Sequence, residues 1–342
     1  MRQMRITPAK GLVLAGFIAA GTFIFTSKLM ENRQTMPVKP LKTVEKTIPV
    51  KKEKEDLSPP VRTLVPEEER KAGAVAKQAT APSSFRKSTL KTARNYLISH
   101  GFGKDDVDSL LADSRVKKQD LRFPKAGTTK VKMTYERYKA YFKLDELAPK
   151  GVKFYLANKD YIEAKEAETG VPKALVLSHY GIESIYGDST GHHLAIDVLL
   201  TRMETNPKRT GFALNELAAL LRLCGKYGKD PLEVNGSDWA AIMPAQAIPT
   251  SLEAFDRRHP CNTFEELISA RNSLAFMFDY LVRAGASNKS GFEPHSRNYN
   301  AAFAYNHSSL YARLAMEFAQ MLEKKIFEAE AETFRMKGVS GF

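Results

Sequence analysis

The stretch that most constrains the fold is an apolar, helix-forming run that ends in a glutamate: Gly170–Gly187, GVPKALVLSHYGIESIYG. Pro172 suits the first position of a helix, and the apolar residues after it recur at helical spacing, which gives a face that can be buried. Glu183 lies on this apolar surface near the end of the run. Burying an ionised carboxylate is costly, so burial would raise its pKa toward the range that suits a general acid near neutral pH. The alternative is a helix-terminal glutamate that points into water.

The chain after residue 85 shows helical periodicity throughout, and few stretches alternate with the period of two that is typical of strands. Leu214–Tyr227 is an amphipathic pattern that ends at a glycine, and Thr263–Val282 begins with a capping-box pattern. Further helices are predicted over 85–99, 104–113, 134–142, 151–169, 194–203 and 298–323, the last of them interrupted at Tyr305–Ser308. Gly236–Ser251 is predicted to be a loop. We expect a mainly α-helical fold without internal repeats.

An uncharged run, Gly11–Ser27, follows three basic residues within the first ten positions. Its length is at the short end of what spans a bilayer, and neither a small-residue cleavage site nor a lipid-anchoring cysteine follows it. We therefore interpret residues 1–30 as a cytoplasmic N-terminus with a signal-anchor segment, in preference to a cleaved signal peptide. Basic residues lie on both sides of the run, so the charge balance does not by itself set its orientation.

Residues 31–84 are rich in proline, lysine and glutamate and poor in aromatic residues, which predicts a disordered tether. The whole chain carries a net charge of +13. Such a surplus favours an anionic partner: nucleic acid, anionic lipid or an acidic polymer such as a bacterial cell wall. Zinc-finger spacing, a basic heptad and an aromatic-basic RNA signature are all absent from the sequence, so a nucleic-acid partner is not supported.

The sequence does not favour a metal site or a cofactor. Its two cysteines, Cys224 and Cys261, form no CxxC pair, so we expect buried thiols and no structural zinc. His179 lies four residues before Glu183, so the two share a face of a helix. A metal site made from these two and a histidine at 192–193 would lack the HExxH spacing. The simpler expectation is a neutral histidine that packs away from any substrate.

Four segments together resemble the membrane-bound lytic murein transglycosylase B family. In chain order they are His100–Phe102, Gly170–Gly187, Asp230–Ser251 and Ala304–Gln320. None is specific alone, but their order and spacing are similar to that family over about residues 85–325. The resemblance implies a lysozyme-like helical catalytic domain over 85–325, followed by a C-terminal tail at 326–342.

The resemblance implies an enzyme that cleaves the MurNAc–GlcNAc β-1,4 bond of peptidoglycan and leaves a 1,6-anhydroMurNAc end. In this scheme Glu183 first protonates the leaving oxygen and then accepts the proton of the sugar's own C6 hydroxyl, so one carboxylate suffices. The resemblance also implies these substrate-binding residues: Ser184, Tyr186, Gln246, Tyr305 and Asn306. For Ser184 and Asn306 the alternative is helix capping or turn formation. For Gln246 it is an ordinary surface loop, and for Tyr305 it is core packing.

Three features depart from the family pattern. The family's glutamine loop is glycine-rich, whereas here it reads AAIMPAQAIP, with Ala241 at the first glycine position and a second glycine missing after Met243. Glycine permits conformations that alanine resists, so we expect a different loop path. Arg257–Glu266 lacks the ligand run of a calcium loop, so no calcium is expected there. His179 occupies an apolar family position, and if protonated it would lower the pKa of Glu183.

The implied location is the bacterial inner membrane, with a single membrane pass and a periplasmic catalytic domain. Peptidoglycan strands and the membrane are the expected partners, with cell-wall or secretion machinery as a further candidate. Two other functions stay open. A catalytically degenerate protein would bind glycan strands or act as a cell-wall scaffold. A hydrolytic muramidase would need a water-activating carboxylate, for which Asp188 and Asp197 are the candidates.

Overall fold

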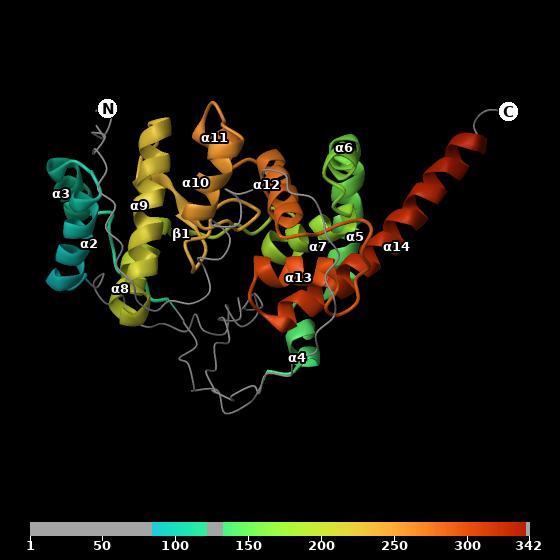
Figure 1. Ribbon diagram of the computed structural model, residues 1–342, viewed down its shortest axis with the longest axis horizontal. Helices are drawn as coiled ribbons and strands as arrows, with labels where there is room; N and C mark the ends of the chain where they lie inside the picture. Colours follow the sequence, from blue (N-terminus) through green and yellow to red (C-terminus); the bar gives the residue numbers. More distant parts are fainter. Residues whose placement is uncertain (1–83, 122–132, 340–342) are drawn as a thin grey trace, which may run out of the picture. The chain divides into compact units, whose positions relative to one another are not determined.

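The computed structural model describes residues 84–121 and 133–339, most of which are helical (Figure 1). The helices are α2 (Lys87–Ser99), α3 (Lys104–Ala112), α4 (Tyr135–Ala140), α5 (Leu144–Ala157), α6 (Lys159–Thr169), α7 (Lys173–Ser184), α8 (Ala195–Thr205), α9 (Thr210–Tyr227), α10 (Pro249–Arg258), α11 (Phe264–Leu267), α12 (Ala270–Arg283), α13 (Arg297–Tyr305) and α14 (Ser309–Val339). Two 3-10 turns, Pro207–Arg209 and Pro231–Glu233, and two short strands, β1 (His193–Leu194) and β2 (Asn235–Gly236), complete these ranges. The prediction of a mainly α-helical fold is confirmed.

Two of the predicted helices are divided in the structure. The segment 151–169 is split between α5 and α6 at Asn158, whose backbone leaves the helical region. The segment Thr263–Val282 forms α11 and α12, because the Ser269 side chain accepts a backbone hydrogen bond and starts a new helix. Helical periodicity continues across both breaks, so the hydrophobic pattern alone does not reveal them.

Helix α14 extends further than its sequence pattern indicates. It runs through residues 326–339, which the sequence analysis sets apart as a C-terminal tail. Ile326 is buried, and Glu330 accepts a hydrogen bond of 2.7 Å from the Tyr155 hydroxyl and pairs with Lys159 at 2.6 Å. These contacts with α5 and α6 hold the distal part of α14 in place.

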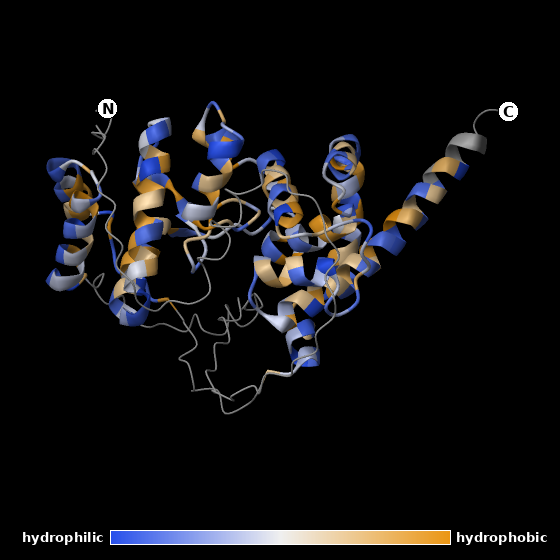
Figure 2. Cartoon of the chain, in the orientation of Figure 1, coloured by the Kyte–Doolittle hydropathy of each residue, from blue (hydrophilic) through white to orange (hydrophobic). Residues whose placement is uncertain are grey.

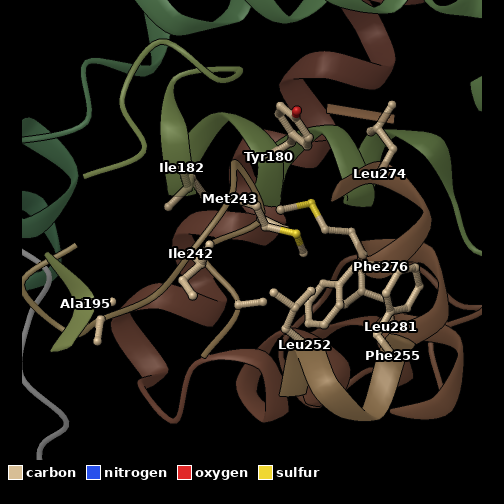
Figure 3. Close-up of a cluster of buried hydrophobic side chains, with 14 of the residues drawn as sticks. Tyr180, Ile182, Ala195, Ile242, Met243, Leu252, Phe255, Leu274, Phe276 and Leu281 are labelled. Atoms are coloured by element: carbon tan, nitrogen blue, oxygen red, sulfur yellow. The ribbon is translucent and has the colours of Figure 1, made fainter. Parts of the chain in front are cut away.

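Helix α7 lies in the centre of the described core. Its residues from Ala174 to Ser184 are all buried, and the helix packs against α5, α12 and α14. Figure 3 shows Tyr180 and Ile182 in a cluster with side chains of the segment before α10 and of α12, including Met243 and Leu274. Full burial of an aliphatic or aromatic side chain contributes about 1.5–3 kcal/mol, so this surrounding shell fixes α7 firmly.

A short antiparallel strand pair joins two loops that are far apart in the sequence. β1 follows the loop after α7, and its His193 pairs with Gly236 of β2. Gly191 has a φ of +98°, and a Cβ atom at this residue would lie 2.2 Å from the carbonyl carbon of Gly236. Only glycine fits this close approach. The pairing therefore places the loop after α7 next to the loop that precedes α10.

Hydrophilic and hydrophobic residues alternate along the helices, as expected for amphipathic helices around a core (Figure 2). Within 84–121 and 133–339, no helix combines the length and the apolar character needed to cross a membrane. The predicted signal-anchor segment at 1–30 and the predicted tether up to residue 83 lie outside the described residues.

Candidate active site

Glu183 is the penultimate residue of α7 and is only 7% exposed. Its Oε1 accepts a hydrogen bond of 2.9 Å from the hydroxyl of Tyr311, a buried residue of α14. The alternative of a glutamate that points freely into water is therefore wrong. The carboxyl group is held at the junction of two packed helices, as a group that transfers protons with fixed geometry needs to be.

A tight turn ends α7 directly after the glutamate. Ile185, Tyr186 and Gly187 have φ values of 54°, 59° and 97°. The Ser184 hydroxyl donates to the carbonyl of Tyr180 at 3.2 Å and accepts from the amide of Gly187 at 3.1 Å. Ser184 is 1% exposed, so in this conformation its side chain holds the turn together, in agreement with the capping alternative.

Tyr186 points away from Glu183 into a slot between helices. A Cβ atom on Gly151 of α5 would lie 2.2 Å from the Tyr186 hydroxyl, and one on Gly181 of α7 would lie 2.8 Å from it. The two glycines therefore make the space that the ring fills. The hydroxyl is buried without a hydrogen-bond partner, and burial raises its pKa. The structure does not bring this hydroxyl together with the other predicted site residues.

The glutamine loop forms a tight hairpin. Ile242 and Ala247 exchange backbone hydrogen bonds of 2.8 and 3.0 Å, so residues 243–246 make the turn. The Gln246 side-chain nitrogen donates to the carbonyl of Met243 and to that of Thr190, both at 3.1 Å. Gln246 is 6% exposed, which rules out the plain surface-glutamine alternative. Its amide links this hairpin to the loop after α7.

The hairpin adopts left-handed backbone conformations without glycine. Ala240, Met243 and Gln246 have φ values of 56°, 60° and 52°. The sequence analysis places the first missing glycine at Ala241, whereas the left-handed residue is Ala240. For a non-glycine residue this conformation costs about 1–2 kcal/mol. Met243 is 3% exposed and points into the apolar cluster of Figure 3, and this burial offsets part of the strain.

Tyr305 links the end of α13 to the glutamine hairpin. Its hydroxyl donates to the carbonyl of Ala245 in the glutamine hairpin at 2.5 Å. Its ring packs edge-on against Tyr280 and His179, with centroid distances of 4.9 and 5.1 Å. Asn306 follows as the C-terminal cap of α13, and its backbone carbonyl accepts from Ser308 at 2.5 Å. Asn306 thus sets the sharp connection between α13 and α14.

His179 does not place a positive charge beside Glu183 near neutral pH. It is fully buried, and burial lowers its pKa to about 4. Its Nδ1 lies 2.8 Å from the carbonyl of Leu175, so Nδ1–H is the donor and the ring is a neutral imidazole. His179 is therefore neutral and packed in the core, as expected, but its ring contacts Tyr305 and Tyr311 and so does not pack away from the predicted site residues. The expected weakening of Glu183 by a histidine cation does not apply.

Tyr311 is the site residue that the sequence analysis missed. It lies in the quoted segment Ala304–Gln320, but it has no feature in the sequence that separates it from a core aromatic. The available signal is its place three residues after Ser308, whose hydroxyl accepts from the Tyr311 amide at 3.3 Å. This cap orients the first turn of α14 and aims Tyr311 at Glu183.

The described residues contain no group of three histidine, cysteine or acidic side chains that could hold a metal ion. His193 instead pairs with Asp238 at 3.1 Å. Cys224 and Cys261 are free thiols, the first buried and the second half-buried. In the segment Arg257–Glu266, the Glu266 carboxylate accepts from the backbone of the preceding turn, as a capping box does.

Comparison with known proteins places this site in a family context. A model of the transglycosylase SLT domain family matches residues 84–285. The membrane-bound lytic murein transglycosylase B of Escherichia coli K12 is 26% identical over 164 residues, which are 46% of this chain and 45% of that protein. The chain therefore aligns with less than half the length of that relative.

Solved structures show the same fold. The Escherichia coli lytic transglycosylase SLT35 in complex with bulgecin A superposes with a TM-score of 0.60 at 18% identity, over 70% of this chain and 94% of that one. SltB3 from Pseudomonas aeruginosa in complex with NAG-anhNAM-pentapeptide gives 0.57 at 17% identity, over 69% and 79%. The predicted lysozyme-like transglycosylase fold is confirmed. Because the family model spans more than half of the sequence, the chain belongs to the transglycosylase SLT domain family.

Proposed function

We propose that this protein is a peptidoglycan lytic transglycosylase that cleaves the MurNAc–GlcNAc β-1,4 bond and forms a 1,6-anhydroMurNAc end. The observation that carries the proposal is the Glu183 carboxyl group, buried at the end of α7 and held by the Tyr311 hydroxyl at 2.9 Å. A buried carboxyl group favours its protonated form, which the first step needs. The Tyr311 hydroxyl, which donates to this group, stabilises the carboxylate that the first proton transfer leaves behind.

The reaction has two proton transfers through the same side chain. Protonated Glu183 gives its proton to the glycosidic oxygen, while the bond from that oxygen to C1 of MurNAc breaks. The C6 hydroxyl of the same sugar then attacks C1 and forms the C1–O6 bond, and its proton passes to the Glu183 carboxylate. Glu183 ends in the state in which it started, and water takes no part.

The environment of the other nearby carboxylates argues against the muramidase alternative. Asp197 accepts from the backbone of Lys117 at 2.9 Å and from the Gln119 side chain at 2.7 Å, so it is already committed to holding that segment. Asp188 is exposed and pairs with Lys150 at 3.3 Å. A hydrolytic enzyme needs a carboxylate that activates water opposite the acid, and neither residue is arranged as such a base.

The remaining predicted site residues support the proposal to different degrees. Gln246 bonds to the loop after α7, Tyr305 bonds to the hairpin that carries Gln246, and Asn306 caps α13. We assign these three residues to substrate binding through the loops that they shape. Ser184 and Tyr186 stay predictions as substrate contacts, although their hydroxyls face the protein interior. The relatives add support, because SltB3 was solved with an anhydro-sugar peptide.

We further propose that Gly11–Ser27 anchors the protein in the bacterial inner membrane and that residues 31–84 carry the catalytic domain into the periplasm. The name of the Escherichia coli relative describes it as membrane-bound. The net charge of +13 favours contact with the anionic cell wall. The test is alkaline extraction of membranes that contain the full-length protein. An integral anchor keeps the protein in the membrane pellet, whereas release into the supernatant would contradict the anchor.

The activity is tested by digestion of purified sacculi with the full-length protein, followed by mass spectrometry of the released fragments. We expect anhydromuropeptides from the wild type and none from Glu183→Gln. Reducing MurNAc ends would identify a muramidase instead. Binding to sacculi without product release would identify a degenerate glycan-binding protein.

A further inference from the structure

His179 is a buried titratable residue that the proposed reaction does not use. It precedes Glu183 by one helical turn and faces the same side of α7. Its Nδ1–H is anchored on the carbonyl of Leu175, whereas its Nε2 is buried without a hydrogen-bond partner. An apolar side chain at this position would avoid the desolvation cost of an unpaired buried acceptor. The imidazole therefore calls for an explanation beyond core packing.

The imidazole ring of His179 packs against two tyrosines, Tyr305 and Tyr311. Its ring meets Tyr305 edge-on at a centroid distance of 5.1 Å and an interplanar angle of 73°. It meets Tyr311 at 5.6 Å and 69°. These two tyrosines come from α13 and α14, so the His179 ring joins α7 to both helices. Edge-on aromatic pairs of this kind are attractive beyond the area that they bury.

Each tyrosine in turn holds one part of the site. Tyr311 donates to the Glu183 carboxylate, and Tyr305 donates to the Ala245 carbonyl in the glutamine hairpin. The direction of each hydroxyl depends on the direction of its ring. The ring that both tyrosines share is the imidazole, and the bond to Leu175 fixes the plane of that imidazole.

We propose that His179 is a positioning residue, a neutral imidazole that sets the spacing of the Tyr305 and Tyr311 rings. Through them it aligns the acid with the loop that carries Gln246. The proposal rests on the proposed function of Glu183. It explains why a buried histidine lies one turn before an acid–base glutamate. The imidazole ring is fixed by its hydrogen bond to Leu175, packs against both tyrosine rings and carries no charge.

The first test compares wild-type protein with His179→Phe, which keeps a flat ring but loses the anchor to Leu175. Full-length protein is assayed on soluble glycan fragments, and kcat and KM are measured separately. We expect kcat to fall by about tenfold or more, because small misplacements of a catalytic group cost up to about 10²-fold. KM should change by less than about twofold. A raised KM with an unchanged kcat would overturn the proposal.

A double-mutant cycle tests whether His179 acts through Tyr311. If it does, His179→Phe and Tyr311→Phe together reduce kcat by little more than the larger single loss. Tyr180→Leu provides the matched control, because Tyr180 is buried in α7 but packs against Phe154 on another face. The fold-loss of kcat in Tyr180→Leu should multiply with the fold-loss in Tyr311→Phe when the two substitutions are combined. If the fold-losses of kcat in His179→Phe and Tyr311→Phe also multiply in the double variant, the proposal is contradicted.

A third measurement needs neither a variant nor an assay. Nitrogen-15 NMR of the wild-type imidazole should show a neutral ring protonated on Nδ1 from about pH 6 to pH 8. A ring protonated on Nε2, or a cation at pH 7, would overturn the proposal even if every variant failed to fold. Because this readout is independent of catalysis, it separates failure of the positioning role from failure of the proposed function, which the sacculus digestion reports.

Discussion

The hydroxyl of Tyr311 donates to Oε1 of Glu183 at 2.9 Å, although the two residues are 128 positions apart in the chain. The contact joins the C-terminal end of α7 to the N-terminal turn of α14. It fixes the direction of the carboxyl group at the end of α7. The packing of α14 against α7 therefore determines the position of the Glu183 carboxyl group.

Tyr311→Phe should therefore reduce kcat by about tenfold or more, since a hydrogen bond to a charged group contributes about 1.5–3 kcal/mol. The initial rate of anhydromuropeptide release measures this effect. Tyr135→Phe is the matched control, because Tyr135 donates to Glu317 at 2.5 Å on another part of α14. Equal losses from the two variants would show that only helix packing is affected.

Tyr186→Phe should raise the free energy of unfolding by about 1 kcal/mol, because it removes a buried hydroxyl that lacks a partner. Denaturant unfolding measures the change. Tyr155→Phe should act in the opposite direction, because the Tyr155 hydroxyl donates to Glu163 and Glu330 at 2.8 and 2.7 Å. If Tyr186→Phe instead lost most of its activity while keeping its stability, the predicted contact with substrate would be supported.

The sequence pattern predicts the helices and the position of Glu183 because both depend on local spacing. Helical periodicity marks α7 and α9, and a carboxylate within an apolar run stands out against its neighbours. The resemblance then groups Gln246, Tyr305 and Asn306 with Glu183. In the structure Tyr305 bonds to the hairpin that carries Gln246, and its ring contacts His179, one turn before Glu183.

Contacts between distant elements are what the pattern could not supply. Tyr311 contacts Glu183 because α14 packs against α7. From the sequence alone, a single tyrosine in a helix is interpreted as a core residue. The slot for Tyr186 depends on Gly151 and Gly181, which come from two different helices. The breaks at Asn158 and Ser269 were missed because the hydrophobic periodicity continues past them. The Asn158 side chain donates to the Phe154 carbonyl at the end of α5, and the Ser269 side chain accepts from the Asn272 amide at the start of α12.

The glutamine hairpin offers a test of backbone strain with two neighbouring alanines. Ala240 and Ala241 are both fully buried, but only Ala240 has a left-handed φ, of 56°. Ala240→Gly removes the strain together with the methyl group, whereas Ala241→Gly removes only the methyl group and adds backbone freedom. Ala240→Gly should therefore be more stable than Ala241→Gly by about 1–2 kcal/mol in denaturant unfolding. The reverse order would show that the hairpin holds Ala240 without strain.

Glu216 gives the protein a pH-dependent stability outside the site. Its carboxylate, 3% exposed on α9, accepts from the amide and the hydroxyl of Thr250 in the first turn of α10, both at 2.8 Å. Burial raises its pKa from 4.5 to about 7 against these two hydrogen bonds. The unfolded chain therefore loses this proton at a lower pH than the folded protein does. Stability falls as pH rises from about 4.5 to about 7, and the loss is complete above that range.

Glu216→Gln should remove this part of the pH dependence, because a neutral amide can keep both contacts with Thr250. Urea unfolding measures the free energy of unfolding of the variant and the wild type at pH 5 and at pH 8. Relative to the wild type, the variant's free energy of unfolding should increase by up to about 3 kcal/mol between pH 5 and pH 8. Thr250→Val should extend the decline of stability to higher pH, because it removes a hydrogen bond that favours the ionised carboxylate. An unchanged difference between Glu216→Gln and wild type at the two pH values would show that Glu216 titrates alike in the folded and unfolded states.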